Sequence, residues 1–361
     1  MTEHKPTVLV AMSGGVDSSV TAALLVQEGY RVIGAMLRLW AAPGPQAENA
    51  CCTLEAMDLA RVVAQQLGIP FHTLDTEEVF RAQVVEPFLE AHAQALTPNP
   101  CLWCNRRVRW AHLLAFAEEM GADHIATGHY ARLRRRPDGS VQLLRGLDEH
   151  KDQSYVLAML PQAHLRRTLL PLGEYTKAEV RRLAAEFRLP VAQRPDSQDL
   201  CFLGGYDYRT FLERYRPELV QPGPILTRDG RRLGTHQGLA FYTIGQRRGL
   251  GVSAAEPLYV LAKDIGQNAL IVGPARELGQ RALEAYEVNW IAGQPPRSQT
   301  FRVQMKIRYK AHPAPATITL LNDHAFRAEF DEPLRDITPG QAAVLYQGEV
   351  CLGGGWIFHT E

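Results

Sequence analysis

The sequence predicts an α/β protein in which a parallel-sheet domain is followed by two smaller β domains. Residues 1–205 alternate apolar strand-like segments with helical segments, a pattern typical of a parallel sheet. The segment Gln221-Pro222-Gly223-Pro224 interrupts the helical pattern, and the residues after it are glycine-rich and strand-like. Short alternating runs separated by turn residues then predict a small antiparallel barrel. We therefore expect domains at residues 1–205, 206–280 (a mostly β connector) and 281–361 (the barrel).

The first domain contains four strand candidates, at residues 7–12, 31–37, 70–74 and 122–127. A helix is expected over residues 53–67, where apolar residues recur on one face and Gly68 follows as a stop signal. A second is expected over residues 172–189, where Thr176 and Glu179 form a capping box. In such a sheet, ligands bind at the carboxyl ends of the strands.

The remaining strand candidates belong to the two smaller domains. They are residues 230–238 and 259–261 in the connector, and 301–306, 316–320, 325–330 and 343–346 in the barrel. Residues 132–136 are read as one side of a hairpin tip because Pro137-Asp138-Gly139 follows. Residues 41–49 are read as a mobile loop.

Composition indicates a globular protein with reduced thiols. The 361 residues are 46% hydrophobic and 22% charged, and 39 basic residues balance 39 acidic ones, so net charge identifies no nucleic-acid partner. Residues 1–6 lack the apolar core of a signal peptide, and no apolar run is long enough to span a membrane. Six cysteines are too few for a secreted disulfide scaffold. We expect a cytoplasmic protein.

The segment 11–19 contains Ser-Gly-Gly-Val-Asp-Ser between a strand and a helix. Glycines and a helix N-terminus form an anion site, because backbone N–H groups can approach a phosphate there. The segment is neither a Walker A loop nor a dinucleotide fingerprint. It resembles the pyrophosphate loop (PP-loop) of adenine nucleotide alpha hydrolase-like ATPases, which cleave ATP to AMP and pyrophosphate. The alternative is an ordinary turn that contains two glycines.

Cys101 and Cys104 form a C-x-x-C motif directly after the stiff segment Thr97-Pro98-Asn99-Pro100. In general, such a motif is either half of a zinc site or a redox-active pair. A zinc site formed by Cys101, Cys104, Cys201 and a histidine remains one interpretation. Cys351 is expected to be buried in a strand. The adjacent Cys51 and Cys52 are either structural or redox-active.

With these motifs in place, the chain resembles the bacterial tRNA-specific 2-thiouridylase family over its full length. Further motifs that carry the resemblance are Gly128-His129-Tyr130, Lys151-Asp152-Gln153-Ser154-Tyr155, and the segments 238–249 and 348–355. The resemblance implies a tRNA-uridine 2-sulfurtransferase that acts on the wobble uridine, position 34. ATP adenylates the uridine O2, and sulfur from a cysteine persulfide then replaces that oxygen at C2. The implied partners are tRNAs for Lys, Glu and Gln and a persulfide donor, either a cysteine desulfurase or a relay protein.

The resemblance also implies roles for particular residues. Cys104 would be the nucleophile and Cys201 the persulfide carrier, and a disulfide between them would fit that route. Asn99, Pro100 and Cys101 would lie against the target base. The implied ATP contacts are Ala11, Met12, Ser13, Gly14, Gly15, Val16, Asp17, Ser18, Leu37 and Gly128. The implied tRNA contacts are His129, Lys151, Asp152, Gln153, Arg308, Tyr309 and Gln341.

Asp17 is the candidate to help hold Mg²⁺ on the pyrophosphate, because a dication offsets charge on the leaving group. It could also cap the following helix, and the two roles are compatible. Basic clusters offer RNA contacts or are simply solvated surface. They lie at Arg106, Arg107 and Arg109, at Arg132, Arg134, Arg135 and Arg136, at Arg247 and Arg248, and at Lys306, Arg308 and Lys310, where Tyr309 adds a stacking surface.

Many family members carry Asp where this chain has Cys101, which opens a second route for sulfur. Cys101, Cys104 and Cys201 could together hold a [4Fe-4S] cluster that delivers hydrosulfide, instead of a persulfide on Cys201. Two other functions remain as alternatives. One is a PP-loop ligase for a small molecule, which would leave the paired cysteines unexplained. The other is a non-catalytic RNA-binding protein with structural zinc.

Overall fold

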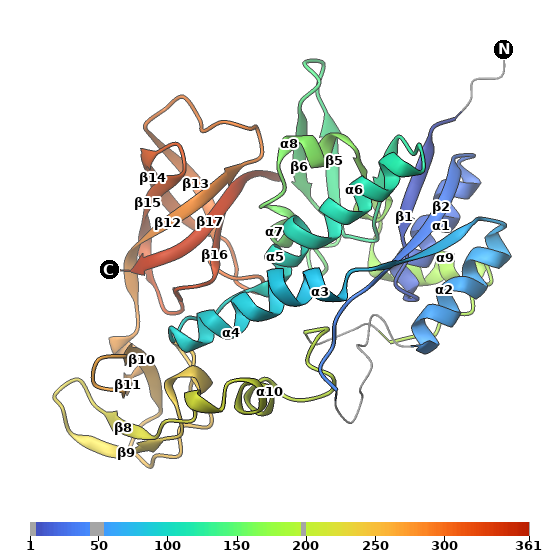
Figure 1. Ribbon diagram of the computed structural model, residues 1–361. Coiled ribbons are helices and arrows are strands. Elements are labelled where there is room, and N and C mark those ends of the chain that lie inside the picture. Colours follow the sequence, from blue (N-terminus) through green and yellow to red (C-terminus); the bar gives the residue numbers. More distant parts are fainter. Residues whose placement is uncertain (1–4, 44–53, 196–199, 361) are drawn as a thin grey trace.

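The computed structural model describes residues 5–43, 54–195 and 200–360, which form three sheets (Figure 1). Cys51, Cys52 and most of the expected loop at 41–49 lie outside the described residues. None of the described helices has the length and apolar character needed to cross a membrane.

The first sheet has five parallel strands in the order β3-β2-β1-β4-β7. They are β1 (Thr7–Ala11), β2 (Arg31–Arg38), β3 (Phe71–Asp75), β4 (His124–Ala126) and β7 (Thr168–Leu169). The first four confirm the strands expected from the sequence. β7 has two residues, too few for a strand pattern to be read from the sequence.

Helices cover both faces of this sheet. Val8 and Val10 of β1 pack towards α1 (Val16–Gln27), α2 (Leu54–Leu67) and α9 (Lys177–Glu186), whereas Leu9 packs on the opposite side with α6 (Trp110–Glu119). Alternate strand residues thus enter two cores, as expected for a buried parallel sheet. Shorter helices complete this part of the chain: α3 (Glu77–Phe80), α4 (Glu86–Ala93), α5 (Pro100–Trp103), α7 (Ser154–Leu157) and α8 (Gln162–Arg166).

The helix expected over residues 172–189 is shorter in the structure. Thr176 and Glu179 form the expected capping box, which starts α9 at Lys177. Thr176 itself is extended, as an N-cap residue must be, so the preceding Pro171–Glu174 forms a separate 3₁₀ turn.

The connector holds a four-stranded sheet in the order β10-β11-β8-β9. Its strands are β8 (Gly223–Leu226), β9 (Arg232–His236), β10 (Leu258–Asp264) and β11 (Ala269–Pro274). A helix not expected from the sequence, α10 (Tyr208–Tyr215), precedes them. Asp207 caps it by accepting hydrogen bonds from the backbone N–H groups of Arg209 and Thr210.

The C-terminal strands close into an antiparallel barrel in the order β12-β15-β14-β13-β16-β17, and β17 pairs back with β12. They are β12 (Gln280–Trp290), β13 (Thr300–Lys306), β14 (Ala314–Asn322), β15 (Ala325–Leu334), β16 (Ala342–Gln347) and β17 (Val350–Thr360). The hairpin of β5 (Ala131–Arg135) and β6 (Val141–Arg145) extends this sheet through the β6–β17 pairing. Cys351 is buried in β17, as expected.

Candidate active site

The Ser-Gly-Gly loop lies at the carboxyl end of β1 and leads into α1. Gly15 is the N-cap of α1 and no side chain caps this helix end. Gly14 has a positive φ of 67°, and a Cβ there would lie 2.1 Å from the backbone oxygen of Ala56 in α2. Glycine is therefore required at Gly14 both by its backbone conformation and by the approach of α2.

A cavity opens beside this loop. Of the residues expected to bind ATP, seven line it: Ala11, Met12, Ser13, Asp17, Ser18, Leu37 and Gly128; Gly14, Gly15 and Val16 do not. A Cβ on Gly128 would lie 2.9 Å from the backbone of Asp17 and Ser18, so this second loop packs closely against α1. The cavity measures about 190 Å³, whereas sites for small molecules usually measure ~300–1,000 Å³. The cavity is therefore smaller than a usual small-molecule site.

Asp17 lines this cavity, and two residues for which the sequence predicted no such contact hold its carboxylate. Lys177 Nζ lies 2.7 and 2.9 Å from the two carboxylate oxygens, and the Tyr130 hydroxyl donates a hydrogen bond of 2.7 Å to one of them. The Lys177 side chain is only 13% exposed, against 33% for Asp17. The helix-capping alternative for Asp17 is wrong, since its carboxylate bonds to these side chains and the cap residue is Gly15.

Three other residues that were not predicted as site residues contact the Ser-Gly-Gly loop or line the cavity. Arg194 donates a hydrogen bond of 2.9 Å to the backbone oxygen of Gly14. Arg109 and Leu113 line the cavity and lie in the helical segment that begins at Pro100. The sequence indicated Arg109 only as one of a basic cluster and Tyr130 only as part of the Gly128-His129-Tyr130 motif, and no local signal points to Lys177 or Arg194.

The cysteine motif starts that helical segment. Asn99 Oδ1 accepts a hydrogen bond of 3.2 Å from the backbone N–H of Cys101, and Pro100 occupies the first helical position. After α5 the helix widens into a π-helical segment, Cys104–Arg109, before α6. Such widened turns are frequent at functional sites.

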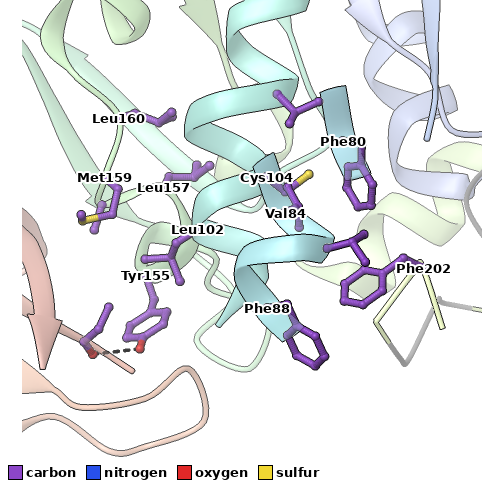
Figure 2. Packing of buried hydrophobic residues seen from close by; sticks show 14 of the residues in the cluster. Phe80, Val84, Phe88, Leu102, Cys104, Tyr155, Leu157, Met159, Leu160 and Phe202 are labelled. Atoms are coloured by element: carbon purple, nitrogen blue, oxygen red, sulfur yellow. Dashed lines mark hydrogen bonds between the residues drawn. The ribbon is translucent and has the colours of Figure 1, made fainter. Parts of the chain in front are cut away.

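The three cysteines differ in their surroundings. Cys101 is exposed, Cys201 is partly buried, and Cys104 is 6% exposed within a core that includes Phe80, Val84 and Phe202 (Figure 2). Phe202 follows Cys201, and its ring packs on Phe80 and Phe88, so the segment around Cys201 lies against the same core as Cys104. No disulfide links Cys101, Cys104, Cys201 and Cys351.

Neither a zinc site nor an iron–sulfur site is assembled by the described residues, which include all three of these cysteines. No three His, Cys, Asp or Glu side chains among them are arranged to hold a metal ion.

The residues expected to contact tRNA fall into two groups. His129 and Gln153 line the cavity beside the loop. His129 Nδ1 lies 2.8 Å from Thr127 Oγ1, and burial lowers the pKa of His129 to about 3, so its ring is neutral. Gln153 accepts a hydrogen bond from the Tyr130 backbone N–H. Asp152 is buried, and its carboxylate accepts hydrogen bonds from the backbone of Gly146 and Ser154 and from the Ser154 hydroxyl.

The others include Tyr309 and Arg308, on the barrel between β13 and β14, and Lys151, in the turn after β6. Tyr309 has a raised pKa, caused by burial and by the nearby negative charges of Asp152 and Cys101. Lys306 Nζ lies 5.7 Å from the centre of the Tyr309 ring. Arg308 donates a hydrogen bond of 2.6 Å to the Asp336 backbone oxygen. Lys151 lies in the turn after β6, where its backbone N–H donates to Asp148.

The basic cluster at residues 132–136 has a structural use. Arg132 and Arg134 both form ion pairs with Glu349, which ties the β5–β6 hairpin to the turn before β17. Arg135 donates a hydrogen bond to the backbone oxygen of Arg166. The hairpin expected from Pro137-Asp138-Gly139 is confirmed.

Comparison with known proteins covers nearly the whole chain. Residues 6–205 match a family model described as "tRNA methyl transferase HUP domain", residues 209–274 a "tRNA methyl transferase PRC-barrel domain" and residues 280–357 an "Aminomethyltransferase beta-barrel domain". A solved structure, the "U34-tRNA thiolase NcsA from Methanococcus maripaludis with its [4Fe-4S] cluster", aligns with 60% of this chain and 67% of that chain at 19% identity. Its TM-score of 0.35 is too low to transfer any feature of its site.

Two curated relatives are much closer. The "tRNA-specific 2-thiouridylase MnmA" of Moorella thermoacetica is 49% identical over 353 residues, which cover 97% of this chain and 98% of that protein. The protein of the same name from Roseiflexus castenholzii is 47% identical over 366 residues, with 97% and 98% covered. At this identity and coverage, the chain belongs to the tRNA-specific 2-thiouridylase MnmA family.

Proposed function

We propose that this protein uses ATP to activate the wobble uridine of tRNA and then replaces its O2 with sulfur. The observation that carries this proposal is the connection between the nucleotide cavity and the cysteine motif. Arg109, which lines the cavity, lies five residues after Cys104 in the same helical segment. One short piece of chain therefore joins a candidate ATP site to a candidate thiol site.

The loop and its neighbours suit the first half-reaction, in which the uridine O2 attacks the α-phosphate and pyrophosphate leaves. The uncapped N-terminus of α1 offers backbone N–H groups to phosphate oxygens. Asp17 lines the cavity and would hold Mg²⁺, because Mg²⁺ prefers oxygen ligands such as a carboxylate. Mg²⁺ offsets charge on the leaving pyrophosphate when bound. Lys177 adds a positive charge beside Asp17 and would offset further leaving-group charge.

The second half-reaction follows from thiol chemistry. The terminal sulfur of a persulfide on Cys201 attacks C2, a C–S bond forms, and AMP leaves with the former O2. The Cys104 thiolate then attacks the Cys201 sulfur, which breaks the S–S bond to the base and releases 2-thiouridine. A Cys104–Cys201 disulfide remains, and an external dithiol must reduce it.

The barrel, with Tyr309 and its neighbouring cations, is the proposed tRNA-binding domain. Lys306 and Tyr309 present a cation and an aromatic face beside Cys101, which suits a base that has left its stack. By resemblance the substrates are tRNAs for Lys, Glu and Gln, and a cysteine desulfurase or a relay protein supplies the persulfide.

The test is 2-thiouridine formation on unmodified tRNA with ATP and Mg²⁺. Iron-free protein supplied with a persulfide donor is compared with anaerobically reconstituted protein supplied with sulfide. Product from the iron-free protein supports the persulfide route, and loss of product in Cys104→Ala and Cys201→Ala assigns both thiols. Product only after reconstitution would replace it with the cluster route. No product from either preparation would refute tRNA thiolation.

A further inference from the structure

The turn that precedes the cysteine motif is held from both sides by the two β domains. It consists of Ala95, Leu96 and Thr97, at the end of α4, which points towards the connector and barrel in Figure 1. Ala95 has a positive φ of 56°, which is unusual for a residue other than glycine. Such a conformation persists only where surrounding contacts maintain it.

The connector contributes Lys263 on β10. Its Nζ donates a hydrogen bond of 2.8 Å to the backbone oxygen of Ala95, 168 residues away in the sequence. A lysine is well placed there, because the last carbonyls of a helix carry partial negative charge. Burial lowers the pKa of Lys263 to about 7. His92, in the last turn of α4, stacks on Tyr208 of α10 with ring centres 6.2 Å apart, so the connector packs on this helix end at two points.

The barrel contributes the loop between β15 and β16. The Thr97 backbone N–H donates to the Pro339 oxygen at 3.0 Å, and Gln341 Nε2 donates to the Thr97 oxygen at 2.7 Å. Gly340 has a φ of 91°, and a Cβ there would lie 3.0 Å from the Thr97 nitrogen. Both backbone polar groups of Thr97 are therefore bonded to the barrel.

A displacement of this turn would pass directly to the cysteines. Only Pro98, Asn99 and Pro100 separate Thr97 from Cys101, and the two prolines leave little freedom to absorb a shift. Misplacement of a reacting group by about 1 Å can lower a rate about 100-fold.

We propose that Lys263 is a positioning residue for sulfur transfer: it fixes the turn at residues 95–97 and thereby the placement of Asn99, Cys101 and Cys104. The connector, for which the sequence indicated no role, thus supports the catalytic segment. This inference rests on the proposed function, because it names the step that the turn controls.

The test compares Lys263→Met, Lys263→Arg, Gly340→Ala and Val260→Ala in the full chain. Val260→Ala is the control, since Val260 is fully buried on the same strand, β10, and its loss weakens the connector without removing the bond to Ala95. We expect Lys263→Met and Gly340→Ala to lower the single-turnover rate of 2-thiouridine formation at least about tenfold, with the KM for ATP within about twofold of wild type. Lys263→Arg, which can still donate to Ala95, should recover part of the rate.

A second measurement does not depend on thiolation. The rate at which iodoacetamide alkylates the exposed Cys101, followed by mass spectrometry, should change about threefold or more in Lys263→Met and Gly340→Ala but not in Val260→Ala. Wild-type protein that forms no 2-thiouridine would refute the proposed function, while the alkylation comparison would still decide whether the turn is controlled by Lys263. The inference would be overturned if Lys263→Met thiolates tRNA and is alkylated at the wild-type rates. It would also be overturned if Val260→Ala loses as much thiolation activity as Lys263→Met.

Discussion

Replacing Lys177 by Met removes the cation beside Asp17 and retains most of the side-chain volume. Lys177 Nζ lies 2.7 and 2.9 Å from the carboxylate oxygens, at a side-chain exposure of 13%. At ~3 Å and an effective dielectric constant of ~20, the gross attraction is about 5 kcal/mol, and desolvation offsets a large part of it. Loss of a single donor that stabilises developing charge typically raises a barrier by about 3–4 kcal/mol, and Lys177 would act in this way if its charge also offsets that of the leaving group. We therefore expect tRNA-dependent pyrophosphate release to fall about 100-fold or more.

The assay measures pyrophosphate release at saturating ATP, with thermal unfolding followed in parallel. Tyr130→Phe is the matched control, because it removes one hydrogen bond of 2.7 Å to the same carboxylate and leaves the charges unchanged. A hydrogen bond to a charged group contributes about 1.5–3 kcal/mol to folding stability, so this variant should lose thermal stability while its rate of pyrophosphate release falls less than that of Lys177→Met. Pyrophosphate release by folded Lys177→Met within about threefold of the wild-type rate would refute a role for the Lys177 charge in this step.

Three further predictions follow from the site. Gly14→Ala should weaken binding of a non-hydrolysable ATP analogue at least about tenfold by calorimetry, because its Cβ would lie 2.1 Å from the Ala56 oxygen. Gly68→Ala has the same φ of 67° with nothing within 4 Å, and should bind normally; equal binding by both variants would contradict the clash. Cys101→Ala should retain 2-thiouridine formation by the persulfide route, and complete loss would favour a cluster. Burial lowers the pKa of His92 to about 4. Between pH 6.5 and 4 the unfolded chain therefore binds more protons, and the unfolding free energy in urea should be about 2 kcal/mol lower at pH 5 than at pH 7 from this residue alone. His92→Phe should remove that part of the pH dependence, and an unchanged dependence would refute the assignment to His92.

Local chemistry explains which parts of the fold could be predicted. The Ser-Gly-Gly loop, the capping box of α9 and the first four strands depend on neighbouring residues, so their patterns are visible in the sequence. The end of the barrel was harder to predict, because β17 contains Gly353-Gly354-Gly355, and glycine runs resemble loops. The structure explains them by close approach: a Cβ on Gly353 would lie 2.0 Å from the Asn289 oxygen of β12, and one on Gly355 would lie 2.9 Å from the Tyr286 oxygen.

The candidate site was predictable only where its residues are close in sequence. The loop from Ala11 to Ser18 could be identified, whereas Lys177 reaches Asp17 across 160 residues and Tyr130 across 113. Nothing in the local sequence of either residue indicates an ionic or hydroxyl partner for Asp17. Tertiary packing alone brings them together, since α9 packs on α1.

The attachment of the barrel to the parallel-sheet domain has a consequence for tRNA binding. β6 pairs with β17 through backbone hydrogen bonds. The buried Tyr155 hydroxyl donates to the Ala342 oxygen (Figure 2), and Gln341 donates to the Thr97 oxygen. These contacts are buried or made by backbone groups, so they constrain orientation more than exposed ion pairs such as Arg134–Glu349, which contribute little. A tRNA bound on the barrel would thus meet a nucleotide cavity and a cysteine motif already held in place. Folding has then already met the entropy cost of ordering these parts, so more of the tRNA-binding energy would be left to place the uridine in the proposed site.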